Sequence, residues 1–317
     1  MLFRSTLGHL PFLQKIGISM RAVKRIGVEF YGDGGIFPSL RSLDMSDFRD
    51  LEEWSTEATA TRQLMTAFPC LESFTLIRCP KLRVLPHIPP SVVKVSIDSD
   101  RLLSAVRTGG SYKLRDLTII NCEALLLSSW WEWMQDLTAL TRLHIHENKL
   151  MCLPESILQL HVPSCWEWMQ DLTALTTLNI RDNKLMCLPE RILQLRVPSL
   201  KIFCLDCKNL KSISGEERDK QQQPPTFFMT IQELQIYSSN ELTALPEWLG
   251  SLTSLRCLKL EDCSKLAMLP DGLQRPTSLR ELEISGCPSW RSDARWMEGR
   301  TDPRSLTPQT FTSGQPK

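Results

Sequence analysis

Two groups of residues in the chain have the types and spacing of metal ligands. Cys204 and Cys207 form a CxxC pair, and His144, His146 and Glu147 lie close together in the sequence. A zinc site would need a second cysteine pair, a redox site favours a first cysteine at a helix start, and the histidines lack the HExxH spacing. Cys204 instead stands inside an apolar strand pattern. We therefore predict no metal site, and a solvated recognition surface around the histidines.

No other pattern in the sequence predicts catalysis. No ordering of Ser, His and Asp and no pair of carboxylates can be assigned to a pocket. The glycine-rich segments GDGGIFP (32–38) and TGGSYK (108–113) lack the spacing and the Lys-Ser/Thr end of a phosphate-binding loop. We expect a protein that is not an enzyme and that binds no nucleotide or other cofactor.

A stretch that occurs twice indicates how these residues are positioned. Residues 131–165 and 166–200 align without a gap and differ at seven places. Each block contains the leucine-rich-repeat motif LxxLxLxxNxL, formed by Leu140, Leu143, Ile145, Asn148 and Leu150, and by Leu175, Leu178, Ile180, Asn183 and Leu185. Because side chains alternate along a strand, the second and third apolar residues of the motif point into the core. The histidines between and after them point the other way.

Positions that open such a strand recur along the chain, 21 to 35 residues apart, at Leu13, Leu40, Leu71, Val92, Leu114, Leu140, Leu175, Leu200, Ile231, Leu255 and Leu279. We predict an α/β repeat fold, a curved leucine-rich-repeat solenoid with parallel strands on its concave face and short helices or turns on its convex face. About eleven coils would occupy residues 1–290. Loops near 55–66 and 215–226 and a polar, disordered tail at 291–317 would leave the solenoid. The imperfect join between the two copies predicts a bulge at 161–174.

Four cysteines occupy the slot that Asn148 has in its coil, namely Cys79, Cys122, Cys263 and Cys287. A buried cysteine fits this slot as a small apolar residue with a weak hydrogen-bond donor. The total of 11 cysteines is odd and the chain is long. We therefore expect reduced thiols in a cytoplasmic protein rather than a disulfide framework. A net charge of +1 and the lack of a long apolar run give no reason to expect nucleic acid or a membrane as a partner.

The two copies differ mainly on one face. Four of the seven differences fall on the outward positions of the strand and on its exit. Exposed substitutions usually cost little, so drift explains this pattern as well as selection for a new partner does. In either case these positions are available for recognition. We predict a protein-binding concave face that includes Arg142, His144, His146, Glu147, Thr177, Asn179, Arg181, Asp182, Gln235, Tyr237, Lys259 and Glu261.

Longer phrases carry a resemblance to a family. Several segments of the chain resemble the leucine-rich-repeat region of plant NLR proteins. They are LGHLPFLQKIGI followed by VKRIGVEFYG, then FPSLRSL…LEEW, FPCLESFTLIRCPKLRVLP and LPEWLGSLTSLRCLKLEDCSKLAMLP. These are the nucleotide-binding leucine-rich-repeat disease-resistance proteins, here of the coiled-coil type. The resemblance runs from about Leu7 to about Ser289.

The resemblance implies a role in recognition. In that family the repeats contact a pathogen effector or a guarded host protein, or restrain the receptor's nucleotide-binding domain. This chain has no phosphate-binding loop and begins inside the repeats, so we expect the recognition region without its nucleotide-binding switch. Two alternatives stay open. One is a leucine-rich-repeat substrate adaptor for ubiquitin ligation, and the other is a receptor fragment that does not signal.

Overall fold

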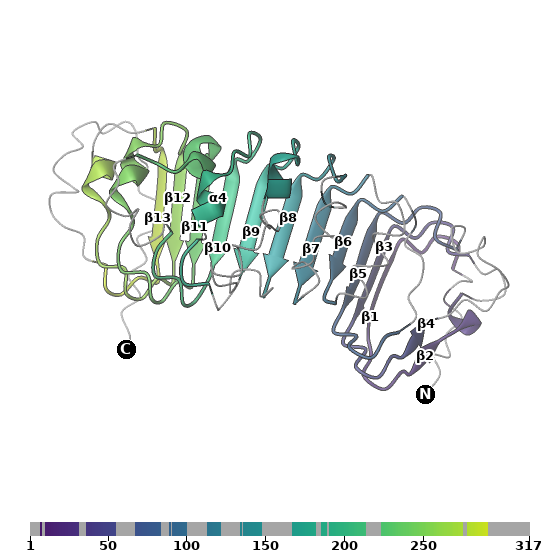
Figure 1. Cartoon of the computed structure of the whole chain (residues 1–317). Coiled ribbons are helices and arrows are strands. Elements are labelled where there is room, and N and C mark those ends of the chain that lie inside the picture. Colours follow the sequence, from purple (N-terminus) through teal and green to yellow (C-terminus); the bar gives the residue numbers. More distant parts are fainter. Residues whose placement is uncertain are drawn as a thin grey trace, which may run out of the picture. The chain divides into compact units, whose positions relative to one another are not determined.

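The computed structural model describes residues 7, 10–31, 36–54, 67–83, 89, 91–99, 113–121, 134, 136–147, 167–181, 185–188, 190–213, 223–274 and 278–290. Contacts divide the chain into two compact units, residues 1–148 and 149–317. Each unit is a leucine-rich-repeat solenoid, in which a strand, a turn and a return segment make one coil (Figure 1). The predicted fold class is therefore confirmed.

In the first unit the strands pair in parallel and in chain order: β1 (Lys15–Ser19), β3 (Ser42–Ser46), β5 (Ser73–Ile77), β6 (Lys94–Ile97), β7 (Asp116–Ile120) and β8 (Arg142–His146). A second parallel pair joins two return segments, β2 (Arg25–Ile26) and β4 (Glu53–Trp54). A 3-10 helix, η2 (Val28–Phe30), follows β2.

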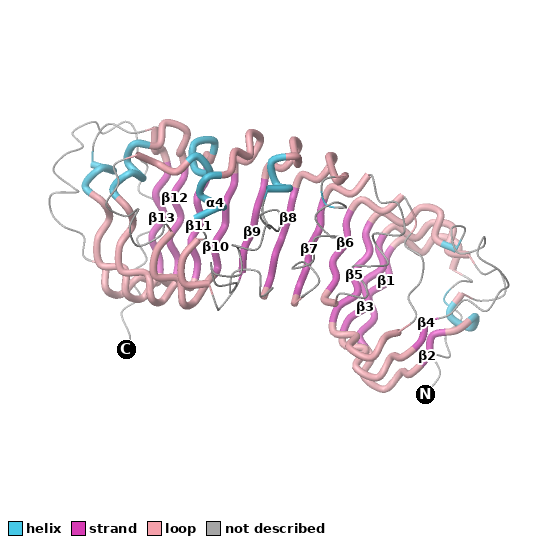
Figure 2. Tube along the Cα trace, viewed as in Figure 1, coloured by secondary structure: helices cyan, strands magenta, loops and turns pink. Residues whose placement is uncertain are grey.

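In the second unit the parallel strands are β9 (Thr177–Arg181), β10 (Ile202–Asp206), β11 (Glu233–Tyr237), β12 (Cys257–Glu261) and β13 (Glu281–Ser285). Short helices lie on the segments that join one strand to the next (Figure 2). They are η6 (Glu167–Gln170), α4 (Glu190–Gln194), η8 (Thr226–Thr230), η9 (Glu247–Ser251) and η10 (Asp271–Gln274).

The apolar pattern accounts for the placement of every described repeat strand in each unit. Each of the predicted opening residues stands two positions before the first residue of a strand. Along β8, Leu143 is 0% and Ile145 3% exposed, while the residues on either side of them are half-buried or exposed. Burial of such side chains from successive coils supplies the main driving force for stacking.

The described parts of the two copies support the same scaffold. Met134, Leu137, Leu140, Leu143 and Ile145 are buried, and so are their equivalents Met169, Leu172, Leu175, Leu178 and Ile180. Residues 167–174 form η6 and the lead-in to β9, and their side chains Met169 and Leu172 lie in the core. The prediction of a bulge at 161–174 is therefore wrong for residues 167–174. Residues 161–166 lie outside the described residues.

The residue after the strand adopts a left-handed backbone in seven coils: Asp47, Arg78, Asn121, Glu147, Ser238, Asp262 and Gly286, with φ between 49° and 61°. This conformation costs a residue other than glycine about 1–2 kcal/mol. It turns the backbone N–H toward the last carbonyl of the next strand, as from Asn121 to His146 at 2.9 Å and from Asp262 to Ser285 at 3.0 Å. The exit turn thus continues the ladder of the sheet by one hydrogen bond, which offsets part of that cost.

Two return segments of the second unit pack with their backbones in close contact. A Cβ added to Gly250 in η9 would stand 2.1 Å from the carbonyl carbon of Gly272 in η10. The Glu247 carboxylate accepts hydrogen bonds from the N–H groups of Asp271 at 3.2 Å and Gly272 at 3.0 Å. It thereby satisfies donors at the start of η10 that have no partner within that helix.

The return segments of the first unit surround an aromatic cluster. Phe30, Phe37, Phe68 and Trp54 are all at most 2% exposed. The indole N–H of Trp54 donates to the Tyr31 hydroxyl at 2.9 Å, within this buried cluster. Burial raises the pKa of Tyr31 well above its usual value, so its hydroxyl stays protonated while the oxygen accepts the Trp54 hydrogen bond. No helix among the described residues is both long and apolar enough to cross a membrane.

Candidate functional site

The candidate surface is the outward face, which we define as the side chains at the first, third and fifth positions of the repeat strands. The structure places eleven of the predicted recognition residues on this face or directly after it, in two groups, one in each unit. Arg142, His144 and His146 lie on β8 and Glu147 at its exit; Thr177, Asn179 and Arg181 on β9; Gln235 and Tyr237 on β11; Lys259 and Glu261 on β12. Asp182 lies outside the described residues. The strand phase predicted from the sequence is confirmed, while the binding role of these residues stays a prediction.

A buried carboxylate organises the outward face of the first unit. Asp116, the first residue of β7, is 4% exposed although it occupies an outward position. Its Oδ2 lies 3.0 Å from Arg142 Nε and 3.6 Å from Lys94 Nζ. His144 Nε2 lies 3.8 Å from Oδ1, which has no hydrogen-bond partner among the described residues. The two long cationic side chains and the imidazole together remove the carboxylate from solvent.

The environment of His144 favours its neutral form. Burial lowers the pKa of this imidazole, and the nearby cations Lys94 and Arg142 act in the same direction. The Asp116 carboxylate raises the pKa but does not outweigh the burial. The His144 ring lies 6.2 Å from the ring of His146, centroid to centroid, in an edge-on arrangement. The predicted pair of histidines therefore stands beside a buried acid.

A hydrogen-bonded group of side chains lies on the outward face of the second unit. Gln235 Oε1 accepts from the Tyr237 hydroxyl at 2.7 Å and from the Cys204 thiol at 3.1 Å. Burial raises the pKa of Cys204 to about 11, so this sulfur stays a neutral thiol donor near neutral pH. These contacts hold Gln235 and Tyr237 in fixed positions on the surface.

Carboxylates dominate the last two strands. Lys259 Nζ lies 3.1 Å from Glu283 and 3.6 Å from Glu281, and its hydrogen bond to Glu283 raises its pKa further above the usual value. Burial, followed by contact with Glu281, raises the pKa of Cys257 to about 12. One lysine thus bridges two strand positions, and its ammonium stays charged. Such an exposed pair contributes little to stability but orients the side chains.

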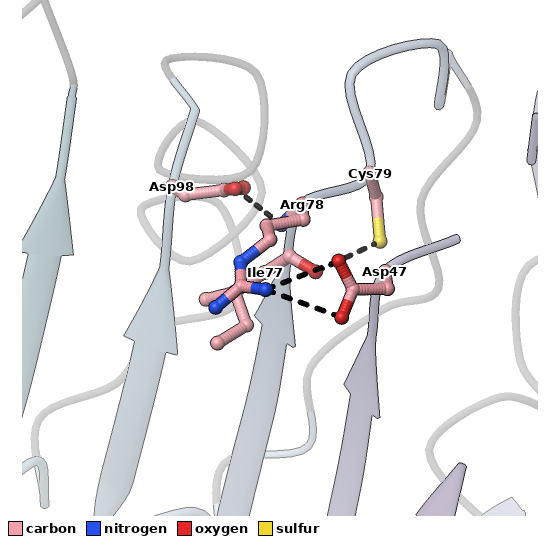
Figure 3. Close-up of polar contacts among 5 residues, drawn as sticks. All are labelled: Asp47, Ile77, Arg78, Cys79 and Asp98. Atoms are coloured by element: carbon pink, nitrogen blue, oxygen red, sulfur yellow. Dashed lines mark hydrogen bonds and ion pairs between the residues drawn. The ribbon is translucent and has the colours of Figure 1, made fainter. Parts of the chain in front are cut away.

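The strand exits of the first unit carry a further polar network (Figure 3). Arg78 Nη1 contacts both oxygens of Asp47 at 3.2 Å, and its backbone N–H donates to the Asp98 carboxylate. β6 ends one residue earlier than its neighbours, and here the Asp98 side chain takes the place of the carbonyl that accepts this bond in other coils. Burial raises the pKa of Asp98 even though this hydrogen bond acts against it.

The two candidate metal-ligand groups of the sequence do not form sites among the described residues. Cys204 lies on the outward face, while Cys207 is fully buried and its thiol contacts the Ile180 carbonyl oxygen at 3.7 Å. The two thiols of the CxxC pair thus contact different neighbouring strands, Cys204 contacting Gln235 of β11 and Cys207 contacting Ile180 of β9. Within the part of the chain that the structure describes, no three His, Cys, Asp or Glu side chains are grouped so that they could hold a metal ion.

Sequence reasoning missed the buried residues of the outward face, above all Asp116. The signal was present in the strand register, since Lys94, Asp116 and Arg142 are successive partners across β6, β7 and β8. Alternation of positive, negative and positive charge at one register position predicts a cross-strand ion network. The burial of Asp116 depends on the long side chains of Lys94 and Arg142 that lie over it.

Comparisons with known proteins place these observations in context. No protein-family profile matches the chain. An RPP13-like disease resistance protein of Arabidopsis thaliana is 30% identical over 129 residues, which is 38% of this chain and only 12% of that protein. Among solved structures, a chain of the Toll–Spatzle complex of Drosophila covers 84% of this chain and 36% of its own length, with 16% identity and a TM-score of 0.48. The leucine-rich-repeat domain of the type III effector XopL covers 84% of this chain and 77% of its own length, with 19% identity and a TM-score of 0.38.

Proposed function

We propose that the outward face is a protein-recognition surface, and that the chain acts as the recognition region of a plant intracellular immune receptor of the NLR type. Its partner would be a pathogen effector, a guarded host protein or the nucleotide-binding domain of a receptor. The protein would work in the cytoplasm and without catalysis. The similarity to the disease resistance protein supports the defence role over the matched segment.

The comparison of the two copies carries the proposal. Leu143 and Ile145 of β8, and their equivalents in β9, have the same buried environment. The outward positions between them have different chemistry and different contacts: Arg142 pairs with Asp116 in the first unit, and Arg181 pairs with Asp206 at 3.2 Å in the second. One scaffold therefore presents two different sets of oriented polar groups, which is the property a recognition surface needs.

The chain itself supplies the variant for a test. Replacing Arg142, His144 and His146 by Thr, Asn and Arg gives β8 the outward residues of β9 and keeps its core unchanged. Lys81→Ala is the matched control, because Lys81 is exposed, follows β5 and pairs only with Asp50 among the described residues.

Binding would be measured against a panel of effectors and receptor nucleotide-binding domains by biolayer interferometry. A partner of the first unit should lose at least tenfold in affinity in the triple variant and less than twofold in the control. Circular dichroism checks that both variants are folded. Equal losses in both variants, or no binding by any protein of the panel, would contradict the proposal.

A further inference from the structure

Two cysteines occupy equivalent positions in successive coils of the second unit. Cys263 follows β12 and Cys287 follows β13, each two residues after the end of its strand. The last residues of the two strands, Glu261 and Ser285, are register partners. The equivalent position after β11 is Ser239, and the one after β3 is Phe48. Among the described residues, the coils of β12 and β13 are the two adjacent coils that both carry a cysteine at this position.

The two thiols share a side-chain hydrogen bond and make equivalent contacts in their own coils. The Cys263 thiol contacts the carbonyl oxygens of Ile236 at 3.8 Å and Glu261 at 3.6 Å. The Cys287 thiol makes the same two kinds of contact one coil later, with Leu260 at 4.0 Å and Ser285 at 3.3 Å. Residues in register on paired strands lie about 4.8 Å apart, which is within the range of about 4.4–6.8 Å between the Cα atoms of a disulfide.

The two thiols differ in access and acidity. Cys263 is fully buried, while Cys287 is half-buried at the last described coil. The side-chain hydrogen bond with Cys263 lowers the pKa of Cys287 to about 7 and raises the pKa of Cys263 far above its usual value. A thiolate is thus available at the accessible sulfur, with a thiol beside it.

We propose that Cys287 and Cys263 form a peroxide-responsive thiol pair that closes to a disulfide between the last two described coils. In the first step the Cys287 thiolate attacks hydrogen peroxide, the O–O bond breaks, and a sulfenic acid and hydroxide result. In the second step the Cys263 sulfur attacks the Cys287 sulfur, the S–O bond breaks, and the oxygen leaves as water with the proton of Cys263. Two electrons pass from the two sulfurs to one peroxide.

The disulfide would act on the least enclosed of the described coils of the second unit. Leu282 and Ile284 occupy the inward positions of β13 but are only half-buried, whereas Leu258 and Leu260 in β12 are at most 1% exposed. A covalent link from this coil to its neighbour restricts local opening of β13. The carboxylates Glu281 and Glu283 on the outward face of β13 would then be held in place, so oxidation would tune the surface that carries the proposed function. The thiol chemistry itself does not depend on that function.

The test treats the full chain with a small molar excess of hydrogen peroxide near neutral pH. Remaining thiols are then blocked with iodoacetamide, and the unreduced protein is digested with trypsin. Mass spectrometry should find the peptides LEDCSK and ELEISGCPSWR joined by a disulfide, at least tenfold more abundant than any other linked cysteine pair. Amide exchange in β13 should slow at least tenfold in the oxidised protein and recover on reduction.

Two variants separate the roles of the sulfurs. In Cys263→Ser the Cys287 sulfenic acid has no thiol beside it, so dimedone labelling of Cys287 should rise at least fivefold. Cys79 occupies the equivalent position after β5, but the preceding coil carries Phe48 there and offers no second thiol. In the control Cys79→Ser the yield of the linked peptide should therefore not change. If the two peptides stay unlinked while Cys70 and Cys187, the exposed thiols among the described residues, become oxidised, the proposal is overturned. The wild-type digest decides even if Cys263→Ser does not fold.

Discussion

The contact between η9 and η10 gives a sharp test of how the coils stack. Gly250→Ala adds a single methyl group at a position whose backbone has no left-handed φ, so the substitution is permitted locally. The new Cβ would nevertheless stand 2.1 Å from the carbonyl carbon and 2.2 Å from the carbonyl oxygen of Gly272, where ordinary contact begins at 3.4 Å. Both atoms belong to the backbone, so no side-chain rotation relieves the clash.

The expected cost follows from what must move. Separating the two segments by about 1 Å is an overpacking strain of about 1–3 kcal/mol. It also pulls Gly272 N–H and Asp271 N–H away from the Glu247 carboxylate, at about 1 kcal/mol for each weakened hydrogen bond. The reduced entropy of the unfolded chain returns about 0.5 kcal/mol. We expect a net loss of about 3 kcal/mol, or about 6–12 °C in the melting temperature of a unit of this size.

Gly17→Ala is the matched control, because Gly17 lies in β1 and an added Cβ would have nothing within 4 Å. This variant should be as stable as the parent or slightly more stable. Urea unfolding followed by circular dichroism measures both, and amide exchange at η9 and η10 shows whether the loss is local. If Gly250→Ala and Gly17→Ala unfold at the same urea concentration, η9 and η10 do not pack with their backbones in close contact.

Three further substitutions test other parts of the molecule. Tyr31→Phe leaves the buried indole N–H of Trp54 without its acceptor and should cost about 1–3 kcal/mol in urea unfolding. Asp116→Asn removes the charge that raises the pKa of His144, so an NMR titration should find that pKa lower still. Glu147→Gly relieves a left-handed backbone at φ 53° and should stabilise the chain by about 0.5–1 kcal/mol in the same urea assay.

Each of these substitutions has a counterpart that should behave differently. Tyr237→Phe removes a hydrogen bond at a half-buried position and should change stability by less than about 0.5 kcal/mol. Lys94→Met removes a charge that lowers the pKa of His144, so the titration should shift upward. Glu147→Val places a β-branched side chain in the left-handed region and should destabilise. A shift of the His144 pKa in the same direction in Asp116→Asn and Lys94→Met would contradict the assigned charges.

Most of the fold could be predicted from the sequence because each coil repeats one local rule. An apolar residue two positions before a strand and alternation within it are properties of neighbouring residues, and they located strands as different as KIGIS and CLKLE. The helical return segments were less predictable. The prediction of a bulge in the lead-in to β9 is wrong because the core that this segment joins is not visible in the segment's own sequence. Its Met169 and Leu172 find a core in the unit that they enter.

The candidate surface was predicted in outline but not in its chemistry. Strand phase fixed which side chains face outward, as for His144 and Tyr237. Burial of Asp116, Cys204 and Cys257 at outward positions depends on the length and charge of side chains on adjacent strands, which a single motif does not contain. At the end of β6 the Asp98 carboxylate accepts the hydrogen bond that a backbone carbonyl accepts in other coils. This exchange likewise depends on how two coils are aligned, which the motif of one coil does not contain.

The left-handed exit residues have a consequence for protein engineering. At Asp47, Asn121, Ser238 and Asp262 the backbone N–H donates to the last carbonyl of the next strand, while the side chain differs from coil to coil. A combinatorial library placed at these positions, with glycine and asparagine included and β-branched residues left out, would vary the rim of the strand face without changing the ladder beneath it. Binders selected from such a library would inherit the scaffold's register, so randomised side chains from successive coils would stand at a constant spacing of about 4.8 Å.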